Sequence, residues 1–548
     1  MKRLLLLALV AFCSGRMAQA VTGCAIMRRA AMIHLALLVT MLSCAAPAAP
    51  KRTAQLFSVS FGSQYTDDDF RRMAEKLDLL ILDALNFPRV PSVLKQVNPN
   101  IKALGYCNTF DIRDMSSFVG RALTPGGKTE RMIREWQEAD AKDWFYHDEQ
   151  GRRVNVYLNK RDDRYGLDIG RPDVRAFLAA KSKAIVDGGY DGVFLDNVGV
   201  RYPYGYGIGG WVSAVPEGLT ERKWWDDSIL MLRAIKEAVG DKLVVFNQVR
   251  GYNPEVSLEF VAEADGAMDE TWLSDGNFKP QQWREDVSLV QRLNKLNTYT
   301  LPIAQGASEQ AAKALFASYL LAKDGEHAYF AYGPYNFTQW KWFAFYDVDL
   351  GDALGDYTHE GNVYLRRYER GMVLVNIADS PATATLPAEY QTGLAERVRS
   401  VRLPGRSGEL LYTLDVRIRL PRTIRRDYLG EAAVDFSEPG PAAAKSITLM
   451  LDVEPTKASS AALLLTLFDA DNPAEGEIVI NGKQTIPLPW GKGPAYNWKN
   501  VTFEAIAIDT AALAQGRNTI TVRRNEGGTF KVSELTVRLM IPREALGP

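Results

Sequence analysis

The sequence predicts an α/β protein built on a closed (β/α)8 barrel, a TIM barrel, with a small β-domain and a C-terminal β-sandwich of jelly-roll type after it. Between residue 55 and about residue 335, short apolar segments alternate with charged, helix-forming segments. Eight such repeats over roughly 280 residues suit a closed barrel better than a doubly wound sheet. After Tyr335 the helical period fades, and short strand-like segments follow to the end of the chain.

The barrel elements are predicted from apolar runs and from helical periodicity. The predicted strands are Gln55–Phe61, Leu79–Ala84, Ile101–Cys107, Gly192–Asp196, Leu243–Gln248, Gly266–Glu270, Thr298–Ala304 and Ala328–Tyr332. The predicted helices include Asp67–Lys76, Pro172–Asp187, Lys223–Val239, Gln281–Leu293 and Ser308–Leu321. The third and fourth strands are separated by about 85 residues, far more than the short connections usual in such folds.

A chain of 548 residues is too long for one domain. We expect the barrel over residues 51–350, the small β-domain over 351–412 and the sandwich over 413–548. Leu414, Val416, Ile418 and Leu420 alternate with polar residues and predict a strand, while Asn481-Gly482 predicts a hairpin turn. Two roles stay open for the sandwich, carbohydrate binding and packing on the barrel.

Residues 1–50 resemble a targeting segment and are not expected to be part of the fold. A basic start precedes the apolar stretch Leu4–Phe12, and a second basic and apolar set spans Met27–Leu42. Cys44 lies in a loose lipoprotein box, and Cys24 fits that pattern better but is far from its apolar core. A plain secretory signal and a lipid anchor both lead to export. We therefore expect a periplasmic or cell-surface protein.

Composition narrows the classes of function. A net charge of -1 argues against a nucleic-acid partner, which would call for a strongly basic surface. Past the leader, Cys107 is the single cysteine, so no disulfide framework is expected. His147, His327 and His359 are scattered without cysteine partners, which argues against zinc. We expect no metal and no cofactor.

Two carboxylates at the ends of predicted strands are the candidate catalytic residues. Asp196 ends the apolar segment Val193–Leu195, and Glu270 ends a later strand. TIM barrels hold their active sites at the carboxyl ends of the strands. Side chains alternate along a strand, so Asp196 shares a face with Phe194 and Glu270 with Met268. The alternative is a structural role as a helix cap or as the partner of an arginine. Both strands open with Asp-Gly, and these matching starts favour a catalytic pair.

Hydrolysis of a glycosidic bond requires such a pair. One carboxyl group protonates the departing oxygen, and the other attacks the anomeric carbon or activates water. A separation of about 5–5.5 Å leads to retention of configuration, and about 6.5–9.5 Å leads to inversion. Whichever group acts as the acid needs a raised pKa. A third carboxylate, Asp168, is expected to cap the helix that begins at Arg171-Pro172.

Polar and aromatic residues near the strand ends are candidates for substrate binding. Amides can bond sugar hydroxyls, and flat rings can stack on sugar faces. The alternatives are that the amides satisfy neighbouring backbone and that the aromatic loop Arg201–Trp211 packs on itself. The candidates are Asp83, Tyr106, Asn108, Asn197, Tyr204, Asn247, Gln248, Trp272, Gln305 and Tyr332.

Three sequence segments resemble hypothetical glycosyl hydrolase family 15, a group similar to barrel enzymes of the endo-α-1,4-polygalactosaminidase type. They are Gly166–Arg175, Tyr190–Asn197 and Arg367–Asn376. The resemblance covers roughly residues 55 to 412 and implies a reaction type without a substrate. It implies that Asp196 is the nucleophile and Glu270 the acid and base. As the acid, Glu270 needs a raised pKa, which we expect from an apolar setting near Trp272 and from the charge of Asp196.

We therefore expect an exported glycoside hydrolase with a polysaccharide or oligosaccharide substrate and a retaining mechanism. The alternative from another class is a non-catalytic carbohydrate-binding surface protein on a degenerate barrel, whose glycan binding would survive loss of either carboxylate. A structural surface lipoprotein is the third reading.

Overall fold

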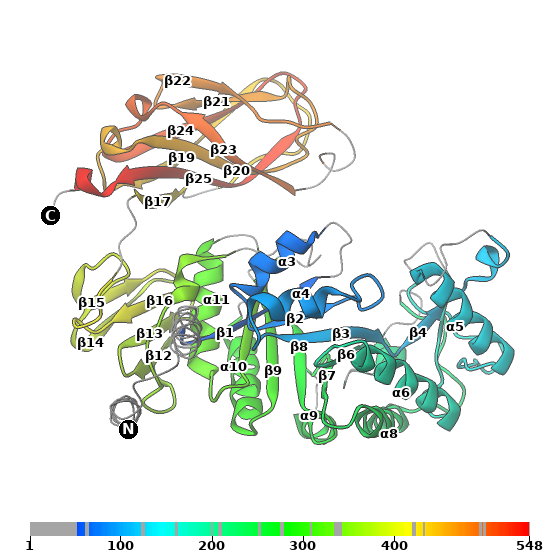
Figure 1. The fold of residues 1–548 in the computed structure, drawn as a ribbon. Helices are drawn as coiled ribbons and strands as arrows, with labels where there is room; N and C mark the ends of the chain where they lie inside the picture. The colour runs from blue at the N-terminus through cyan, green and yellow to red at the C-terminus, as the bar shows by residue number, and fades with distance from the viewer. Residues whose placement is uncertain are drawn as a thin grey trace, which may run out of the picture. The chain divides into compact units, whose positions relative to one another are not determined.

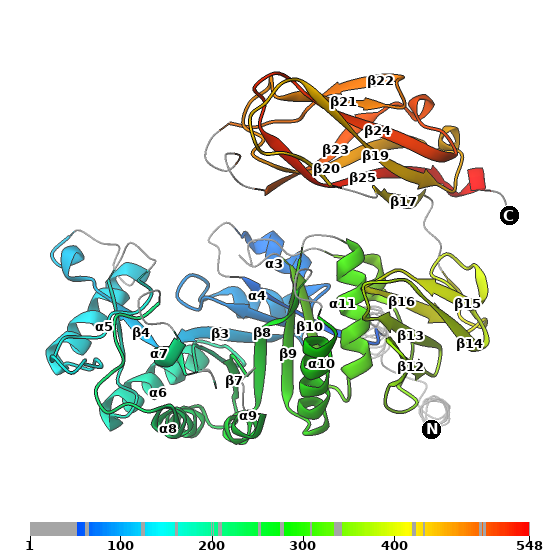
Figure 2. The same ribbon diagram turned by 180° about the vertical axis from the view of Figure 1, so that it is seen from behind.

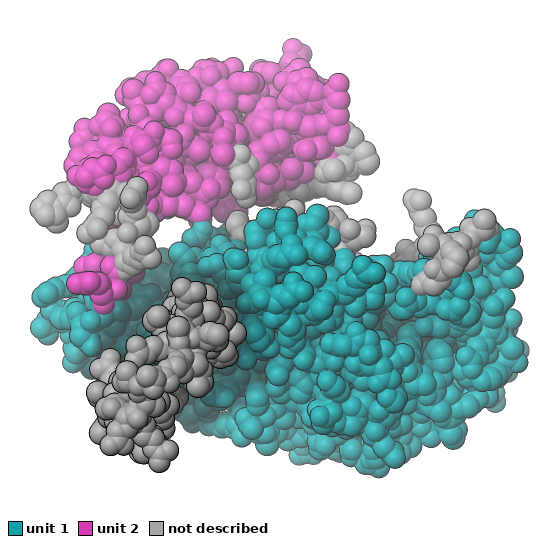
Figure 3. Space-filling view, in the orientation of Figure 1, with its two compact units in different colours: residues 1–392, 396–416 teal, residues 393–395, 417–548 magenta. Residues whose placement is uncertain are grey.

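The computed structural model describes residues 52–60, 65–121, 127–158, 163–198, 200, 202–206, 211–249, 254–274, 279–306, 309–333, 342–418, 423–430, 433–492, 496 and 500–546. The predictions for the leader, including Cys24 and Cys44, lie outside the described residues. The chain divides into two compact units, Met1–Thr392 with Glu396–Val416, and Gly393–Ala395 with Arg417–Pro548, coloured separately in Figure 3.

The first unit contains a closed barrel of eight parallel strands, which confirms the predicted fold class. The strands hydrogen-bond in the order β1-β10-β9-β8-β7-β6-β3-β2 and close into a ring. They are β1 Gln55–Ser60, β2 Leu79–Leu82, β3 Lys102–Asn108, β6 Gly192–Asp196, β7 Leu243–Asn247, β8 Gly266–Ser274, β9 Tyr299–Gln305 and β10 Tyr329–Gly333.

Helices cover the outside of the barrel. Figures 1 and 2 show α6 and α8 beside β6 and β7, and α10 and α11 beside β9 and β10. Helix α8 begins after Thr220, whose hydroxyl accepts the backbone N–H of Lys223, while α6 begins with Pro172, where a missing N–H costs nothing. The helices are α3 Asp67–Ala74, α4 Val90–Val97, α5 Lys128–Lys142, α6 Pro172–Asp187, α7 Pro203–Tyr206, α8 Glu221–Val239, α9 Pro254–Val261, α10 Pro280–Lys295 and α11 Glu309–Ala322, with 3-10 turns at Ser116–Phe118 and Ala344–Asp347.

Two apolar layers define which side chains face inward. The barrel interior is filled by alternate strand residues such as Phe57, Ile81, Phe194 and Met268. The residues between them, such as Leu80, Leu82 and Phe330, pack outward against the helices. Side chains alternate along a strand, so a residue two positions after an interior residue also faces inward. It lies nearer the open, C-terminal end of the barrel.

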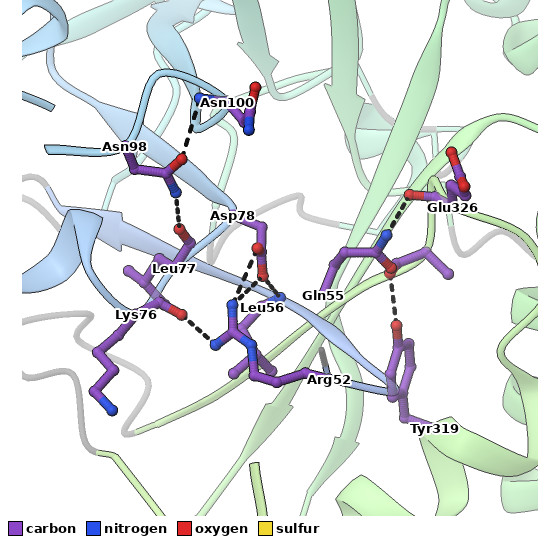
Figure 4. Close-up of polar contacts among 11 residues, drawn as sticks. Arg52, Gln55, Leu56, Lys76, Leu77, Asp78, Asn98, Asn100, Tyr319 and Glu326 are labelled. Atoms are coloured by element: carbon purple, nitrogen blue, oxygen red, sulfur yellow. Dashed lines mark hydrogen bonds and ion pairs between the residues drawn. The ribbon is translucent and has the colours of Figure 1, made fainter. Parts of the chain in front are cut away.

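At the opposite end of the barrel, aspartates that precede strands accept backbone N–H groups of neighbouring strands. Asp191 and Asp265, just before β6 and β8, each accept the backbone N–H of the preceding barrel strand at 2.8 Å, from Ala103 and Val244 respectively. Asp78, before β2, does the same for Leu56 and also receives two bonds from Arg52 (Figure 4). The sequence pattern Asp-Gly thus marks the floor of the barrel.

The glycines of these two Asp-Gly pairs are required by close approach. A Cβ on Gly192 would lie 2.3 Å from the carbonyl oxygen of Leu243, and one on Gly266 would lie 2.2 Å from that of Tyr299. Both contacts are to backbone, so the neighbouring strand would have to move.

The long connection between β3 and β6 forms a small layer of its own. It contains α5 and the antiparallel pair β4 Asp111–Arg113 and β5 Arg164–Gly166. An ion pair between Arg164 and the buried Asp111 links these two strands at 3.0 Å. Asp168, expected to cap α6, instead accepts the N–H of Gly170 in the turn before it, and α6 has no side-chain cap.

An antiparallel sheet follows the barrel within the same unit. Its order is β11-β12-β13-β16-β14-β15. The guanidinium of Arg366 on β12 donates to the carbonyl of Leu321 near the end of α11, and Lys313 of α11 pairs with Glu409 of β16. These contacts tie the sheet to the barrel. The strands are β11 Thr358–Glu360, β12 Val363–Tyr368, β13 Gly371–Asn376, β14 Ala382–Gln391, β15 Arg397–Leu403 and β16 Ser407–Tyr412.

The second unit is a β-sandwich. One sheet has the order β17-β25-β20-β23, with β18 also paired to β25, and the other has the order β19-β24-β21-β22. Leu463 and Leu465 of one sheet and Ile478 and Ile480 of the other meet in a common core. The strands are β17 Thr423–Leu429, β18 Val434–Phe436, β19 Ala443–Leu451, β20 Ser460–Phe468, β21 Gly476–Ile480, β22 Gln484–Pro487, β23 Asn500–Ile508, β24 Gly516–Arg524 and β25 Phe530–Pro542, with 3-10 turns at Pro455–Lys457, Thr510–Ala512 and Arg543–Leu546.

Two local predictions for this region have different outcomes. The Asn481-Gly482 hairpin is confirmed, since both residues have positive φ, 49° and 68°, between the paired strands β21 and β22. The strand predicted from alternation at Leu414–Leu420 is wrong over residues 414–418. These residues form a turn in which the N–H of Val416 bonds the carbonyl of Thr413.

Candidate active site

Asp196 and Glu270 lie at the open end of the barrel, on β6 and β8. Each is two positions beyond an interior apolar residue, Phe194 or Met268, so both belong to the inward face of their strands. Asn247, at the end of the intervening strand β7, follows the interior Val245 in the same way and is 1% exposed. The adjacent strands β6, β7 and β8 therefore each direct one polar side chain into the open end of the barrel.

The amide of Asn247 joins the two carboxylates. Its Nδ2 atom donates to Asp196 Oδ1 at 2.8 Å and to Glu270 Oε2 at 2.8 Å. Two such bonds from one atom limit the separation of these oxygens to about 5.6 Å, twice the bond length. Because the two N–H bonds of an amide diverge by roughly 120°, the expected separation is about 4.8 Å.

Asp196 is held more firmly than Glu270. The hydroxyl of Tyr106, on β3, donates to Asp196 Oδ2 at 2.8 Å, and the backbone N–H of Asn197 donates to Asp196 Oδ1 at 2.9 Å. With Asn247, Asp196 therefore accepts three hydrogen bonds. The carboxylate of Glu270 accepts the bond from Asn247, while Gln305 Nε2 donates to the backbone carbonyl of Glu270 at 2.8 Å.

Burial raises the pKa of both carboxyl groups. For Glu270 the charges of Asp196 and Asp269 raise the pKa further, and the bond from Asn247 opposes the shift. For Asp196 the bonds from Asn247, Tyr106 and the Asn197 N–H all oppose the effect of burial. A single negative charge is most stable where most donors point. The three donors around Asp196 therefore favour the negative charge on Asp196 over Glu270 when the pair holds one proton.

Other predicted binding residues gather around this pair. Tyr106 and Gln305 contact it directly. Asn108 lies at the end of β3, where its Oδ1 accepts from Asn197 Nδ2 at 3.2 Å and its Nδ2 donates to Asp111 at 2.7 Å. Gln248 follows Asn247 directly and is half-buried. The amides of Asn108 and Asn197 thus organise the loops that border the pair.

Three predicted sugar contacts are corrected by the structure. Trp272 is fully buried in the layer between barrel and helices, where its Nε1 donates to the carbonyl of Asp286. Tyr204 is also fully buried, among Phe110, Tyr146 and Trp224. Tyr332 is the neighbour of the interior-facing Ala331, so it points outward and packs on Phe343.

Asp83 follows β2 but is engaged in local contacts. Its carboxylate accepts the N–H of Leu85 and a bond from Asn86, and it pairs with Lys128 at the start of α5. The pKa of Glu270 is raised by burial and by the charge of Asp196, as expected, while Trp272 itself lies in the outer layer.

Two residues near the pair were not predicted. Tyr157 bonds Asn197 by its side chain, and burial together with the charges of Asp111 and Asp196 raises its pKa. The charge of Asp111 also raises the pKa of Asp196. Both residues come from the long β3–β6 connection, where no strand end signals a site. The pairing of β4 with β5 brings that connection to the site.

Over the described ranges, no group of three or more histidine, cysteine, aspartate or glutamate side chains is arranged to hold a metal ion. In the same part of the chain, none of the helices is long and apolar enough to span a membrane. Cys107 is buried and unpaired by any disulfide.

A closed (β/α)8 barrel with two inward carboxylates at its open end is an architecture of glycoside hydrolases. The family model described as "Hypothetical glycosyl hydrolase family 15" matches residues 95–372, just over half of the chain. The chain belongs to this family and is a glycoside hydrolase. A search of curated proteins gives no match.

Several solved structures are similar to this chain at low identity. The glycoside hydrolase domain of PelA from Pseudomonas aeruginosa is 13% identical, with a TM-score of 0.35 and coverage of 53% of this chain and 97% of that one. Ega3 from Aspergillus fumigatus, in complex with galactosamine, is 11% identical, with a TM-score of 0.33 and coverage of 54% and 97%. Isomalto-dextranase from Arthrobacter globiformis T6, complexed with panose, is 10% identical, with a TM-score of 0.40 and coverage of 89% and 97%.

Proposed function

We propose that this glycoside hydrolase is exported and cleaves O-glycosidic bonds of a polysaccharide or oligosaccharide with retention of configuration. Asp196 attacks the anomeric carbon while Glu270 protonates the departing oxygen. Glu270 then removes a proton from the water that hydrolyses the glycosyl-enzyme intermediate. The observation that carries the proposal is the shared donor Asn247, which holds an oxygen of each carboxyl group at 2.8 Å.

The separation supports retention. About 4.8 Å between the bridged oxygens is close to the 5–5.5 Å typical of retaining pairs, and well short of the roughly 6.5–9.5 Å needed to seat a water in an inverting enzyme. The roles follow from the hydrogen bonds. A nucleophile must be ionised, which suits Asp196 with its three donors, and an acid must be protonated, which suits Glu270.

The first experiment is a screen of the purified protein against bacterial and plant polysaccharides, with released reducing ends as the readout. Asp196→Asn and Glu270→Gln are each expected to abolish release while the fold persists. Asp265→Asn, at the barrel floor, is the matched control and should keep the activity. Wild-type activity in Asp196→Asn would overturn the assignment, and glycan binding without any cleavage would favour the carbohydrate-binding alternative.

Stereochemistry is tested on the substrate found by that screen. Proton NMR of the first product should show the anomer of the substrate, before mutarotation. For Asp196→Gly, added azide should yield a glycosyl azide of inverted configuration if Asp196 is the nucleophile. Initial formation of the opposite anomer by the wild type would replace this mechanism with inversion, and Asp196 would then be the base.

Export rests on the sequence of residues 1–50. We propose cleavage after a signal peptide and either release or attachment through a lipid on Cys44 or Cys24. Cell fractionation with mass spectrometry of the mature N-terminus decides among these forms. Recovery of the full-length chain in the cytoplasm would refute export.

A further inference from the structure

Two non-glycine residues that directly follow barrel strands at the site, Asn197 after β6 and Gln248 after β7, have a left-handed backbone. Asn197 has a φ of 63° and Gln248 a φ of 65°. Each follows directly on a polar inward residue at the end of adjacent strands, Asp196 on β6 and Asn247 on β7. Positive φ is uncommon for residues with a Cβ and tends to cluster at functional sites.

Both residues make the same contact with the residue before them. The N–H of Asn197 donates to Asp196 Oδ1 at 2.9 Å, and the N–H of Gln248 donates to Asn247 Oδ1 at 2.7 Å. The second bond is decisive for the amide of Asn247. Because Oδ1 of Asn247 accepts this N–H, its Nδ2 atom faces the carboxyl groups. The two hydrogens of Nδ2 are donated to Asp196 and Glu270. With the amide reversed, its oxygen would face two acceptors.

The chain is anchored on both sides of this peptide. Asn247 belongs to β7, and beyond Gln248 the N–H of Val249 bonds the carbonyl of Met268 on β8 at 3.1 Å. The buried Val249 also bonds the hydroxyl of Ser257 through its carbonyl at 2.9 Å. A change of φ at Gln248 must therefore be absorbed by rotation of the Asn247–Gln248 peptide plane, since each residue has only two soft dihedrals. That rotation turns the N–H away from Asn247.

We propose that Gln248 is a positioning residue for the catalytic pair. Its left-handed backbone aims its own N–H at Asn247 and so fixes the amide in the orientation that bridges Asp196 and Glu270. This inference rests on the proposed function, because it assigns the pair to catalysis. It differs from a role as a simple strand end, which would affect stability and leave the chemistry untouched.

The test compares variants that lose the same side chain but differ in backbone preference. Gln248→Gly accepts positive φ without strain, whereas Gln248→Val is β-branched and resists it. On the polysaccharide that the wild type cleaves, kcat of Gln248→Val is expected to be at least about 10-fold below that of Gln248→Gly, with similar KM. Gln248→Asn, which tolerates the left-handed region, should match Gln248→Gly.

The pH profile separates positioning from stability. A displaced amide withdraws a hydrogen bond from both carboxylates, so both limbs of the kcat profile should move to higher pH in Gln248→Val and stay in place in Gln248→Gly. Equal kcat and equal limbs in the two variants would overturn the proposal. If Gln248→Val does not fold, Gln248→Ala takes its place, because Ala carries a milder penalty at positive φ.

Crystal structures of the variants give a readout that needs no activity. In Gln248→Val the Asn247–Gln248 peptide should be rotated and Asn247 Nδ2 displaced from the carboxylates, while Gln248→Gly keeps the wild-type arrangement. If the amide of Asn247 is not displaced in Gln248→Val, the positioning role is refuted, whatever the activity of that variant. Conversely, a moved amide in a protein that cleaves no polysaccharide supports the positioning role and refutes the proposed function.

Discussion

Asp196 and Glu270 accept hydrogen bonds from one nitrogen atom, Nδ2 of Asn247, although they lie on strands that are not neighbours in the barrel. The strand between them supplies that donor. The spacing of the pair therefore depends on a residue that is neither nucleophile nor acid in the proposed mechanism.

Replacement of Asn247 tests this dependence. Asn247→Ala should lower kcat/KM on the order of 10²-fold, because the two carboxyl groups lose their common anchor and can shift relative to the sugar. The measurement is steady-state kinetics on the polysaccharide found in the screen. Asn98→Ala removes an amide of the same kind at the barrel floor, where Asn98 bonds the carbonyl of Leu77 (Figure 4), and should keep kcat/KM. A fall in both variants would point to general destabilisation.

The pKa shifts predict the pH dependence. The proposed mechanism requires Asp196 ionised and Glu270 protonated, so kcat/KM should rise with the ionisation of the pair and fall when its last proton leaves. Burial raises the pKa of both groups, and both limbs should therefore lie above the ordinary range of exposed carboxyl groups. A bell-shaped profile in that range is the expected result. An acid limb at the pKa of a free aspartate would contradict the burial argument.

The same shift at Glu270 has a consequence for stability. A raised pKa means that the fold favours the protonated form, so the ionisation of Glu270 costs stability as the pH rises through its pKa in the folded protein. Glu270→Gln removes that cost. Its Tm should exceed that of the wild type by a few degrees at pH 8 and match it at pH 4, where the wild-type group is protonated. If the variant and the wild type have the same Tm at pH 8 as well as at pH 4, the ionisation of Glu270 costs the fold no stability.

Replacement of Asp265, at the floor of the barrel, should lower the stability of the protein and leave its activity unchanged. Asp265 accepts the N–H of Val244 and pairs with Lys236 at 2.7 Å. Asp265→Ala leaves that N–H without its partner, which costs about 1–3 kcal/mol when the group is buried, while the site at the far end of the strands is untouched. Thermal unfolding should show a lower Tm, and kcat/KM should stay within about twofold of the wild type. A large loss of kcat/KM in the folded variant would contradict a purely structural role.

The strands and the candidate pair could be predicted from the sequence for a simple reason. Buried parallel strands are short apolar runs, and such barrels carry their chemistry where those runs end. Asp196 and Glu270 follow from that rule. The matching Asp-Gly starts do not bear on catalysis. They are explained by the barrel floor, since Asp191 and Asp265 bond the backbone of the preceding strands.

The parts that could not be predicted depend on tertiary pairing and on an irregular register. Tyr157 and Asp111 approach the pair because β4 pairs with β5 within the long connection, and no local pattern announces that pairing. Strand β8 continues to Ser274 beyond a register shift between Asp269 and Leu273, so simple alternation fails after Glu270. Tyr332, by contrast, could have been assigned outward by alternation from the interior Tyr329.

The register shift in β8 leads to a prediction for Trp272. The ring is fully buried between barrel and helices, and its N–H donates to the carbonyl of Asp286 at 2.9 Å. Trp272→Phe should lower Tm, because it leaves a cavity and removes the hydrogen bond from Nε1 to Asp286, while KM for the polysaccharide stays the same. Kinetics and thermal unfolding of the same preparation give both values. A ring that stacked on the sugar would show the reverse, a raised KM with an unchanged Tm, and that result would return Trp272 to the substrate site.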